Sequence, residues 1–346
     1  MKLSVLASLL TLATAALAGQ TPGNNTCKRP LERKEWRTLS ALERFAYLAA
    51  VRCLQILPAK SKATVPGARS RFEDFAGNHI LQTDTVHFVG HFQPWHRYFL
   101  ATYEKALREE CGYRGAQPYW DWSLDATTAE NFMKAPVFRS ILGFGGNGPY
   151  TDEGFVSAPF DIPGRTGGGC VPDGPFADQE LHIGPGYSVT PNSYCLTRDI
   201  SPTIVLSALN SSVVERTLAQ PDFASFDVFL QGGTTPDTFT VHAGGHLGVG
   251  GKYGTIADVY SSPLDPLFYL HHANLDRIWA KWQSADPARL TDISGPVSQF
   301  GPPFGDAPNT QNVTLDFEVG LGVVGKNSKI SEVMTPIYGV LCYKYV

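Results

Sequence analysis

The sequence predicts a mainly α-helical fold wrapped by long, ordered loops. Three stretches, near residues 40–57, 94–110 and 266–283, repeat their apolar residues with the period of a helix. The chain also holds 34 glycines and 25 prolines among 346 residues, which indicates long connections rather than a series of uninterrupted helices. Because no internal repeat or low-complexity segment is visible, one domain is the simpler interpretation.

The three helical stretches have recognisable ends. The first follows Ser40, a favoured N-cap residue, and its apolar positions are Leu42, Phe45, Leu48, Ala49 and Leu54. The second begins near Pro94, which a first helical turn tolerates, and Gly112 follows it as a stop. The third runs from about Pro266 to Gln283, with apolar positions that include Leu267, Leu270, Leu275, Ile278 and Trp282.

The region between residues 142 and 186 is rich in glycine and proline and has little periodicity. It nevertheless contains four phenylalanines, Phe144, Phe155, Phe160 and Phe176. Disordered linkers are poor in aromatic residues. We therefore expect an extended loop that packs over the body of the protein.

The first 18 residues resemble a targeting segment. Lys2 supplies a positive start, residues 3–12 are apolar, and residues 16–18 give the small-residue pattern of a cleavage site. The apolar run is shorter than the roughly 20 residues that span a bilayer. We expect a signal peptide at 1–18 and a secreted, extracellular domain at 19–346. Glycosylation sequons begin at Asn24, Asn210 and Asn312.

The charge pattern excludes nucleic acid as a partner. The formal net charge is -4, and lysine and arginine are scattered without the basic stripe that nucleic-acid binding needs. No later segment is long and apolar enough to span a membrane. We therefore expect small-molecule partners only, and the sequence does not indicate an oligomeric state.

The six cysteines predict disulfides rather than a thiolate metal site, because their number is even, the chain is expected to be exported, and no C-x-x-C pair occurs. Six cysteines allow fifteen pairings. The pairing we predict is Cys53 with Cys111, Cys170 with Cys195, and Cys27 with Cys342, which would tie the two ends of the chain together.

Histidines carry the main functional pattern. Eight of the nine fall within residues 79–96 and 242–272. His242 and His246 are four residues apart, so on a helix both face the same way and can bind one ion. In the first cluster His79, His87 and His96 are eight and nine residues apart, and Pro94 breaks the stretch. We expect these three to converge from separate short elements.

Two all-imidazole sites without cysteine suit copper, zinc, iron or nickel. A zinc-hydrolase interpretation of residues 242–246 fails, because Ala243 stands where the general-base glutamate would be required. His91, four residues after His87, is a competing ligand at this point of the argument. His182 lies alone and is expected to be a packing or surface residue.

Several motifs, in this order and spacing, resemble those of the tyrosinase and catechol oxidase group of type-3 copper proteins, in particular its short secreted fungal members. The resemblance covers nearly the whole mature chain. The matching segments are residues 87–97 (HFVGHFQPWHR), 118–122 (PYWDW), 143–148 (GFGGNG), 265–272 (DPLFYLHH) and 343–345 (YKY).

The resemblance implies two copper ions inside a four-helix bundle core. The first would be bound by His79, His87 and His96, and the second by His242, His246 and His272. The family pattern chooses His272 over its neighbour His271 and makes His91 a neighbour of the site. Asp276 becomes a carboxylate that supports the ligands or a helix-packing group. The alternative is a structural salt bridge with an arginine such as Arg97.

Three positions bear on the substrate. Ala243 follows the first ligand of the second copper, where phenol-hydroxylating relatives often carry asparagine. Gly233 stands where some bacterial members carry a glutamate that holds a water molecule, and Val259 matches a small gate above the second copper. No acid or base beyond the metal ligands is singled out.

These positions predict an oxidase that converts o-diphenols (catechols) to o-quinones with O2. One alternative is a tyrosinase that also hydroxylates monophenols, and another is a non-catalytic dicopper protein that binds O2. The motif at 343–345 resembles the end of the catalytic domain, so the C-terminal lid domain of longer relatives is expected to be missing.

Overall fold

The computed structural model describes residues 27–302, 304–308 and 311–346. The predicted signal peptide at 1–18 and the sequon at Asn24 lie outside these residues. The mainly α-helical prediction is confirmed, because the described strands are only two or three residues long. None of the described helices combines the length and apolar character that crossing a bilayer requires.

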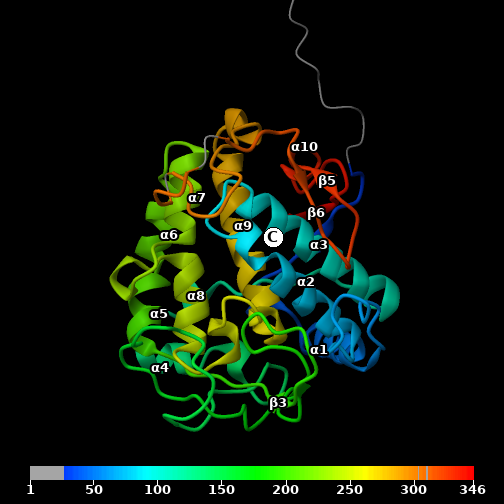
Figure 1. The fold of residues 1–346 in the computed structure, drawn as a ribbon, viewed down its shortest axis with the longest axis vertical. Helices are drawn as coiled ribbons and strands as arrows, with labels where there is room; N and C mark the ends of the chain where they lie inside the picture. The colour runs from blue at the N-terminus through cyan, green and yellow to red at the C-terminus, as the bar shows by residue number, and fades with distance from the viewer. Residues whose placement is uncertain (1–26, 303, 309–310) are drawn as a thin grey trace, which may run out of the picture.

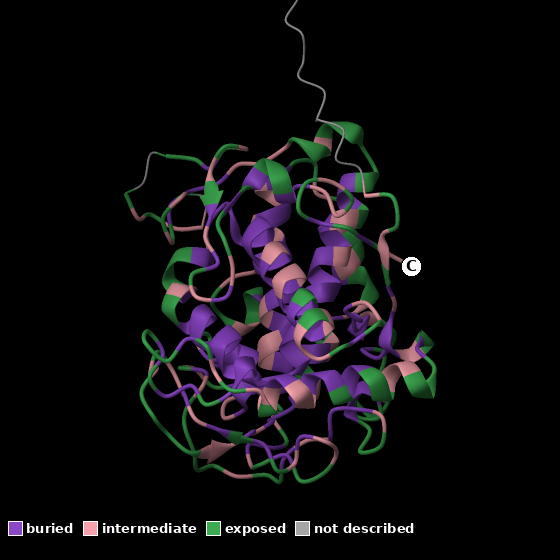
Figure 2. Ribbon diagram, turned by 90° about the vertical axis from the view of Figure 1, so that its right-hand side faces the viewer, coloured by how far each residue is buried: buried purple, intermediate pink, exposed green. Residues whose placement is uncertain are grey.

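Four helices form the centre of the molecule: α2 (Arg71–Val86), α3 (Phe92–Glu110), α8 (Val241–Gly250) and α9 (Leu267–Ser284) (Figure 1). Helix α3 contacts α2 and α9, and α9 contacts α8. Seen from the side, this centre is largely buried while exposed residues lie on the outer helices and loops (Figure 2). The expected four-helix core is therefore present.

Shorter elements surround this core. The outer helices are α1 (Ala41–Ile56), α4 (Ala129–Met133), α5 (Pro202–Ala208), α6 (Ser211–Leu218), α7 (Phe223–Gln231) and α10 (Ile330–Val333). The described strands form three pairs: β1 (Leu31–Arg33) parallel to β6 (Tyr343–Tyr345), and β2 (Glu180–Leu181) with β3 (Tyr194–Cys195) and β4 (Glu318–Val319) with β5 (Ser328–Lys329), both antiparallel.

The local signals for helix ends are confirmed. Ser40 and Glu43 form a capping box at the start of α1, in which each side chain accepts a hydrogen bond from the other residue's backbone N–H. Pro94 lies in the first turn of α3. Gly112 directly follows the C-cap of α3 with a φ of 66°, the left-handed conformation that glycine adopts easily.

Two expectations were wrong. Residues 71–86 form the four-turn helix α2 rather than short separate elements, and this helix starts with a second capping box, Ser70 with Glu73. In α1 the predicted apolar face is also displaced: Leu42 and Phe45 are 81% and 63% exposed. The buried face runs instead through Tyr47, Leu48, Val51 and Leu54, because these residues point toward α2 and α3.

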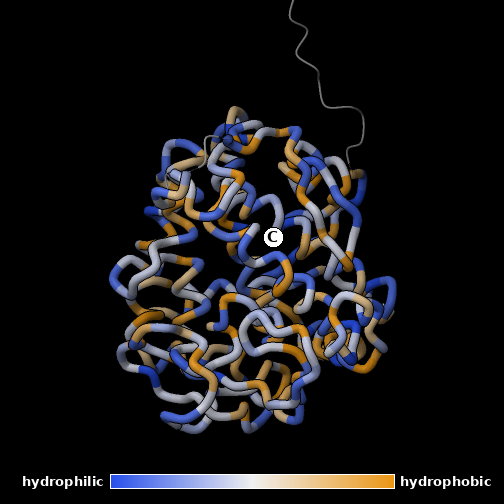
Figure 3. The backbone as a smooth tube through the Cα atoms, in the orientation of Figure 1, coloured by the Kyte–Doolittle hydropathy of each residue, from blue (hydrophilic) through white to orange (hydrophobic). Residues whose placement is uncertain are grey.

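The glycine-rich segment 142–186 packs over the body as expected. The rings of Phe144 and Phe176 are fully buried and stack with centroids 5.6 Å apart. Figure 3 shows hydrophobic and hydrophilic residues mixed along these loops, at the lower end of the view. Phe155 differs from the others, because it remains 48% exposed.

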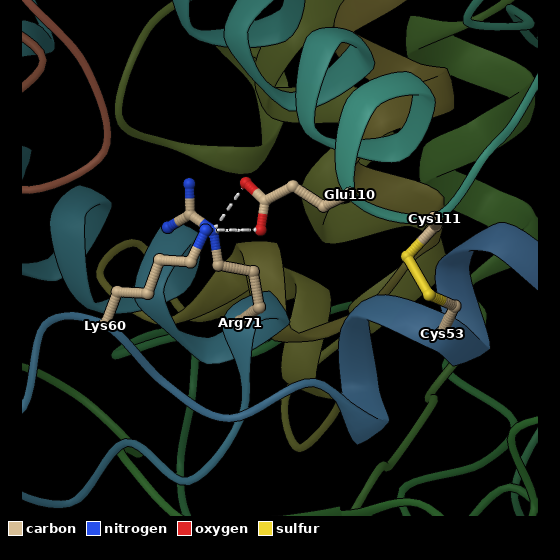
Figure 4. The surroundings of a disulfide bond; sticks show 5 residues. All are labelled: Cys53, Lys60, Arg71, Glu110 and Cys111. Carbon is tan, nitrogen blue, oxygen red and sulfur yellow. Dashed lines mark hydrogen bonds and ion pairs between the residues drawn. A yellow bond between two sulfur atoms is a disulfide. The ribbon is translucent and has the colours of Figure 1, made fainter.

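All three predicted disulfides are present: Cys53–Cys111, Cys170–Cys195 and Cys27–Cys342. Cys111 directly follows α3, so its bond to Cys53 attaches the end of α3 to α1 (Figure 4). Beside it the Glu110 carboxylate accepts hydrogen bonds from Arg71, at the start of α2, and from Lys60. One end of the four-helix core is thus fixed to its surroundings by both covalent and ionic contacts.

Asp276 on α9 is the centre of a buried ionic network. Its carboxylate accepts hydrogen bonds from Arg97 Nε on α3 at 2.5 Å and from Arg33 on β1 at 3.3 Å. The hydroxyls of Tyr343 and Tyr345, both on β6, donate to the same carboxylate at 2.6 and 2.5 Å. Burial alone would raise the pKa of Asp276, but these four donors outweigh it and lower the pKa.

This geometry distinguishes between the expectations for Asp276. Asp276 forms the salt bridge with Arg97 that was the alternative, and among the described residues no hydrogen bond joins Asp276 to a histidine ring. It supports the site only indirectly, by fixing α9, which carries His272, to α3, which carries His96.

We expect the substitution Asp276→Asn to lower the free energy of unfolding by about 3–5 kcal/mol, because it removes the negative partner of two buried guanidinium groups. Urea denaturation measures the change. The matched control is Asp316→Asn, which removes an exposed ion pair with Lys329, in which the Asp316 side chain is 84% exposed, and is expected to change stability little. Equal effects of the two substitutions would contradict the central role of this network.

Candidate metal centre

Six histidines gather in two groups of three in the middle of the four-helix core. One ring nitrogen from each of His79, His87 and His96 lies within 4.8 Å of the others, and the same holds for His242, His246 and His272. These are the six residues that the sequence nominated. The two groups face each other, since the rings of His96 and His272 stack with centroids 4.5 Å apart.

The first group is built by α2 and α3. His79 lies within α2, His87 is the C-cap residue of that helix, and His96 follows one turn into α3. The connection between the helices contains Phe88, whose φ of 53° is unusual for a residue with a side chain. The Gln231 carboxamide oxygen accepts a hydrogen bond from the Phe88 N–H at 2.7 Å, which holds this turn in place.

The second group is built by α8 and α9. His242 and His246 lie one turn apart on α8, and His272 lies on α9. Two glycines lie between the α8 histidines and allow other helices to approach α8 closely: Gly245 faces α9, and Gly244 faces α5. A side-chain carbon at Gly245 would lie 2.0 Å from His271, and one at Gly244 would lie 2.4 Å from Ala208 of α5.

Backbone carbonyl groups orient four of the six rings. The Nδ1–H of His79 donates to the carbonyl of Tyr260, and that of His246 donates to the carbonyl of Ile256, both at 2.7 Å. His87 and His96 donate in the same way to carbonyls one turn earlier, at 2.9 Å. With Nδ1 protonated and engaged, the unprotonated Nε2 of each ring turns inward.

Several of these inward nitrogens have no partner in the protein. The Nε2 atoms of His79, His96 and His242 are buried without a hydrogen bond, and those of His246 and His272 lie 3.1 Å apart. Burying an unpaired polar nitrogen is costly. A metal ion in each group would satisfy these lone pairs, so the donor set fits two cations held by neutral imidazoles.

Burial keeps these imidazoles neutral. It lowers the pKa of both His87 and His246 to about 4, against the attraction of their carbonyl partners. Burial, followed by repulsion from neighbouring histidines, also lowers the pKa of His79, His96, His242 and His272 well below its usual value. Metal binding requires the deprotonated ring, and these ligands are in that form near neutral pH.

The three other histidines have different partners. His271 accepts a hydrogen bond from the Trp122 indole at Nδ1 and donates from Nε2 to the carbonyl of His242, both at 3.2 Å, so neither nitrogen is free. His91 donates to the carbonyl of Thr85 and lies in neither group. His182 contacts the carboxylates of Glu73 and Glu180 near the surface, as expected of a packing residue.

A pocket of about 420 Å³ opens over both groups. His87, His242 and His246 line it, and so do the predicted substrate-pocket residues Ala243, Gly233 and Val259. The sequence missed the aromatic part of its wall. Phe88 and Phe300 stack there with ring centroids 4.7 Å apart, although 212 positions separate them, and no sequence pattern links them.

The structure adds a restriction at Gly233. A side-chain carbon at this position would lie 2.1 Å from the Thr238 hydroxyl, so a side chain there would require Thr238 to move. Among the described residues that line the pocket, none carries an ionised side chain, and the amide group of Gln231 is already bonded to Phe88 and Asp227.

Comparison with known proteins agrees with this geometry. The family model for the common central domain of tyrosinase matches residues 69–285, a range that contains all six histidines. The chain belongs to the tyrosinase family.

Members of the tyrosinase family resemble this chain over most of its length. N-acetyl-6-hydroxytryptophan oxidase ivoB of Emericella nidulans is 36% identical, with 99% of each chain covered. Tyrosinase P of Aspergillus terreus is 34% identical over 92% of this chain and 93% of its own. A mutant polyphenol oxidase of Thermothelomyces thermophila has the same fold, with a TM-score of 0.81, 36% identity, and 92% and 89% of the two chains covered.

The tyrosinase family carries a dicopper site, and the residues present here fit it. Each group supplies three nitrogen ligands and no sulfur or carboxylate, which suits copper among the first-row metals. The open face of both groups is the pocket, so a substrate can approach the metals from there.

Adjacent histidines provide a matched test of this assignment. We expect His272→Ala to reduce the copper content of the loaded protein from two ions per chain to one, measured by elemental analysis. His271→Ala should retain both ions but lose about 1–3 kcal/mol of stability, because it leaves Trp122 and the His242 carbonyl unpaired. The opposite pattern would show that His271 is the ligand.

The pKa shifts predict how stability of the copper-free protein depends on pH. Each histidine with a lowered pKa binds a proton more readily in the unfolded chain, where its pKa is about 6.5, than in the folded protein. In the folded protein the pKa of His87 and His246 is about 4. Stability should therefore be greatest above pH 6.5 and fall toward pH 4, by roughly 1.4 kcal/mol per pH unit for each such histidine.

Urea denaturation of the copper-free protein at several pH values measures this slope. The variant His246→Asn, which lacks one of these groups, should give a shallower slope over the same range. Constant stability between pH 7 and pH 4.5 would show that the histidines titrate normally and contradict the geometry described above.

Proposed function

We propose that this member of the tyrosinase family is a secreted catechol oxidase, which converts o-diphenols to o-quinones with O2. The observation that carries the proposal is the pocket over the two histidine groups, which has apolar walls and no ionised side chain among its described lining residues. Such a pocket favours a neutral aromatic ring. When bound, the copper pair supplies the redox chemistry with O2.

The reaction balances without any further reactant. Two o-diphenols lose two electrons and two protons each and leave as two o-quinones. One O2 takes up these four electrons and four protons and leaves as two water molecules. The residues of this chain bind and orient the ring through the stacked pair Phe88 and Phe300 and through Ala243 and Val259, which also line the pocket.

The absence of a base argues against hydroxylation of monophenols. A monophenol has one hydroxyl group, whose proton must be removed as the ring binds the metal. Gly233 has no side chain, Ala243 has only a methyl group, and the Gln231 amide is occupied by Phe88 and Asp227. An o-diphenol depends less on such assistance, because it donates electrons directly and needs no new C–O bond.

Three disulfides support the proposal that the protein is secreted, since disulfides persist in oxidising compartments. The same observation agrees with the signal peptide expected at residues 1–18. Of the described sequons, Asn312 is exposed, whereas the Asn210 side-chain amide donates to carbonyls of Leu206 and Ser207. We propose Asn312 as the better acceptor for a glycan.

Oxygen consumption by the copper-loaded protein tests the proposed activity. We expect rapid uptake with 4-tert-butylcatechol and uptake at least about 100-fold slower with tyrosol, because no general base assists the monophenol. The copper-deficient variant His272→Ala is the control. Prompt uptake with both substrates would identify a tyrosinase. No uptake with either, at two coppers per chain, would reject the catechol oxidase proposal.

A further inference from the structure

A second hollow, which we call the outer groove, adjoins the metal pocket. It has a volume of about 810 Å³ and shares Ser157, Pro159 and Val259 with the pocket. Val259 therefore stands between the two spaces, and its side chain is 49% exposed. A ligand that reaches the metals can extend past Val259 into the outer groove.

The outer groove has large exposed side chains that are mainly apolar. Tyr187 is 80% exposed, and Phe155 and Val156 are 48% and 47% exposed. The ring of Tyr187 packs edge-on against that of Tyr260, with centroids 6.1 Å apart. Neighbouring exposed apolar groups beside a pocket are typical of a binding surface.

The outer groove offers no free charge. Among the described residues that line it, the ionisable side chain other than tyrosine is Asp258, which is buried. Its carboxylate accepts hydrogen bonds from the backbone N–H groups of Gly186, Tyr260 and Ser261 and from the Ser261 hydroxyl. Because these bonds occupy both oxygens, an occupant meets no free carboxylate. It meets apolar side chains together with the neutral hydroxyl groups of Ser157, Ser188 and Thr190.

The walls of the outer groove are held in place by backbone hydrogen bonds. The loop that carries Tyr187 is closed by the Gly184 N–H, which donates to the Ser188 carbonyl at 2.7 Å. The opposite wall is attached through the Ser157 N–H, which donates to the Lys252 carbonyl at 2.8 Å. A surface fixed in this way pays little entropy when a ligand binds.

We infer that the outer groove binds the substituent of the substrate and that the enzyme acts on o-diphenols carrying a bulky, uncharged aromatic substituent. The inference rests on the proposed function, because it places the o-diphenol ring over the histidines and the substituent beyond Val259. Because the outer groove adjoins the metal pocket at Ser157, Pro159 and Val259, one small molecule can occupy both spaces, and this favours a substrate substituent over a partner protein.

The test compares two substrates of the copper-loaded enzyme, unsubstituted catechol and 4-(2-phenylethyl)catechol, by the ratio of their kcat/KM values. We expect the wild type to prefer the extended substrate at least tenfold, mainly through a lower KM. Tyr187→Ala and Phe155→Ala should each reduce this preference about five- to tenfold, because each removes a ring that contacts the substituent. Phe45→Ala, which removes an exposed ring outside both spaces, should leave the preference intact.

A charged comparison sharpens the result. The anion 3-(3,4-dihydroxyphenyl)propionate should show no gain over catechol, because no lysine or arginine is among the described residues that line the outer groove. If the preference for the phenylethyl substrate is absent, or survives both alanine variants, the inference is wrong. If catechol itself is not oxidised, the proposed function fails instead. A dimer in solution that Tyr187→Ala converts to a monomer would assign the outer groove to a second copy of the chain.

Discussion

The buried carboxylate of Asp276 holds together parts of the chain that are far apart in sequence. Two arginines and two tyrosine hydroxyls from β1, α3 and β6 converge on it, and Arg33 also pairs with Glu104 of α3 at 2.6 Å. The charges of the two arginines balance those of Asp276 and Glu104, which reduces the free-energy cost of burying the network. Because α3 and α9 each supply one metal-centre histidine, the separation of the two histidine groups depends on this contact.

The segment 256–260 performs a second linking role. Its first and last carbonyls orient His246 and His79, which belong to different groups, and Val259 between them lines the mouth of the pocket. Asp258, bonded to the following backbone and to Gly186, fixes the conformation of the segment. The orientation of histidines in both groups and the access of the substrate to the pocket therefore depend on the same five residues. A substitution in this segment that alters the access is expected to alter the orientation of the histidines as well.

Much of this arrangement could be predicted from sequence, and the failures have physical causes. The caps of α1, the stop after α3 and the six histidines are local patterns. Helix α2 escaped prediction because its polar residues are committed to distant partners: Asp74 accepts from the backbone of residues 60 and 61, and Asn78 from Val323. Carbonyl groups that orient histidines leave no trace in sequence, and neither does the meeting of Phe88 with Phe300.

The bond between Cys27 and Cys342, beside the paired strands β1 and β6, makes a covalent ring of nearly the whole described chain. An exopeptidase that trims either end must stop at this closure, and one internal cut leaves both fragments joined. The ring also means that the segments around Cys27 and Cys342 stay side by side in the fold. A circular permutant, in which these two segments are joined and new termini are placed in an exposed loop, is therefore expected to keep the contacts of the core.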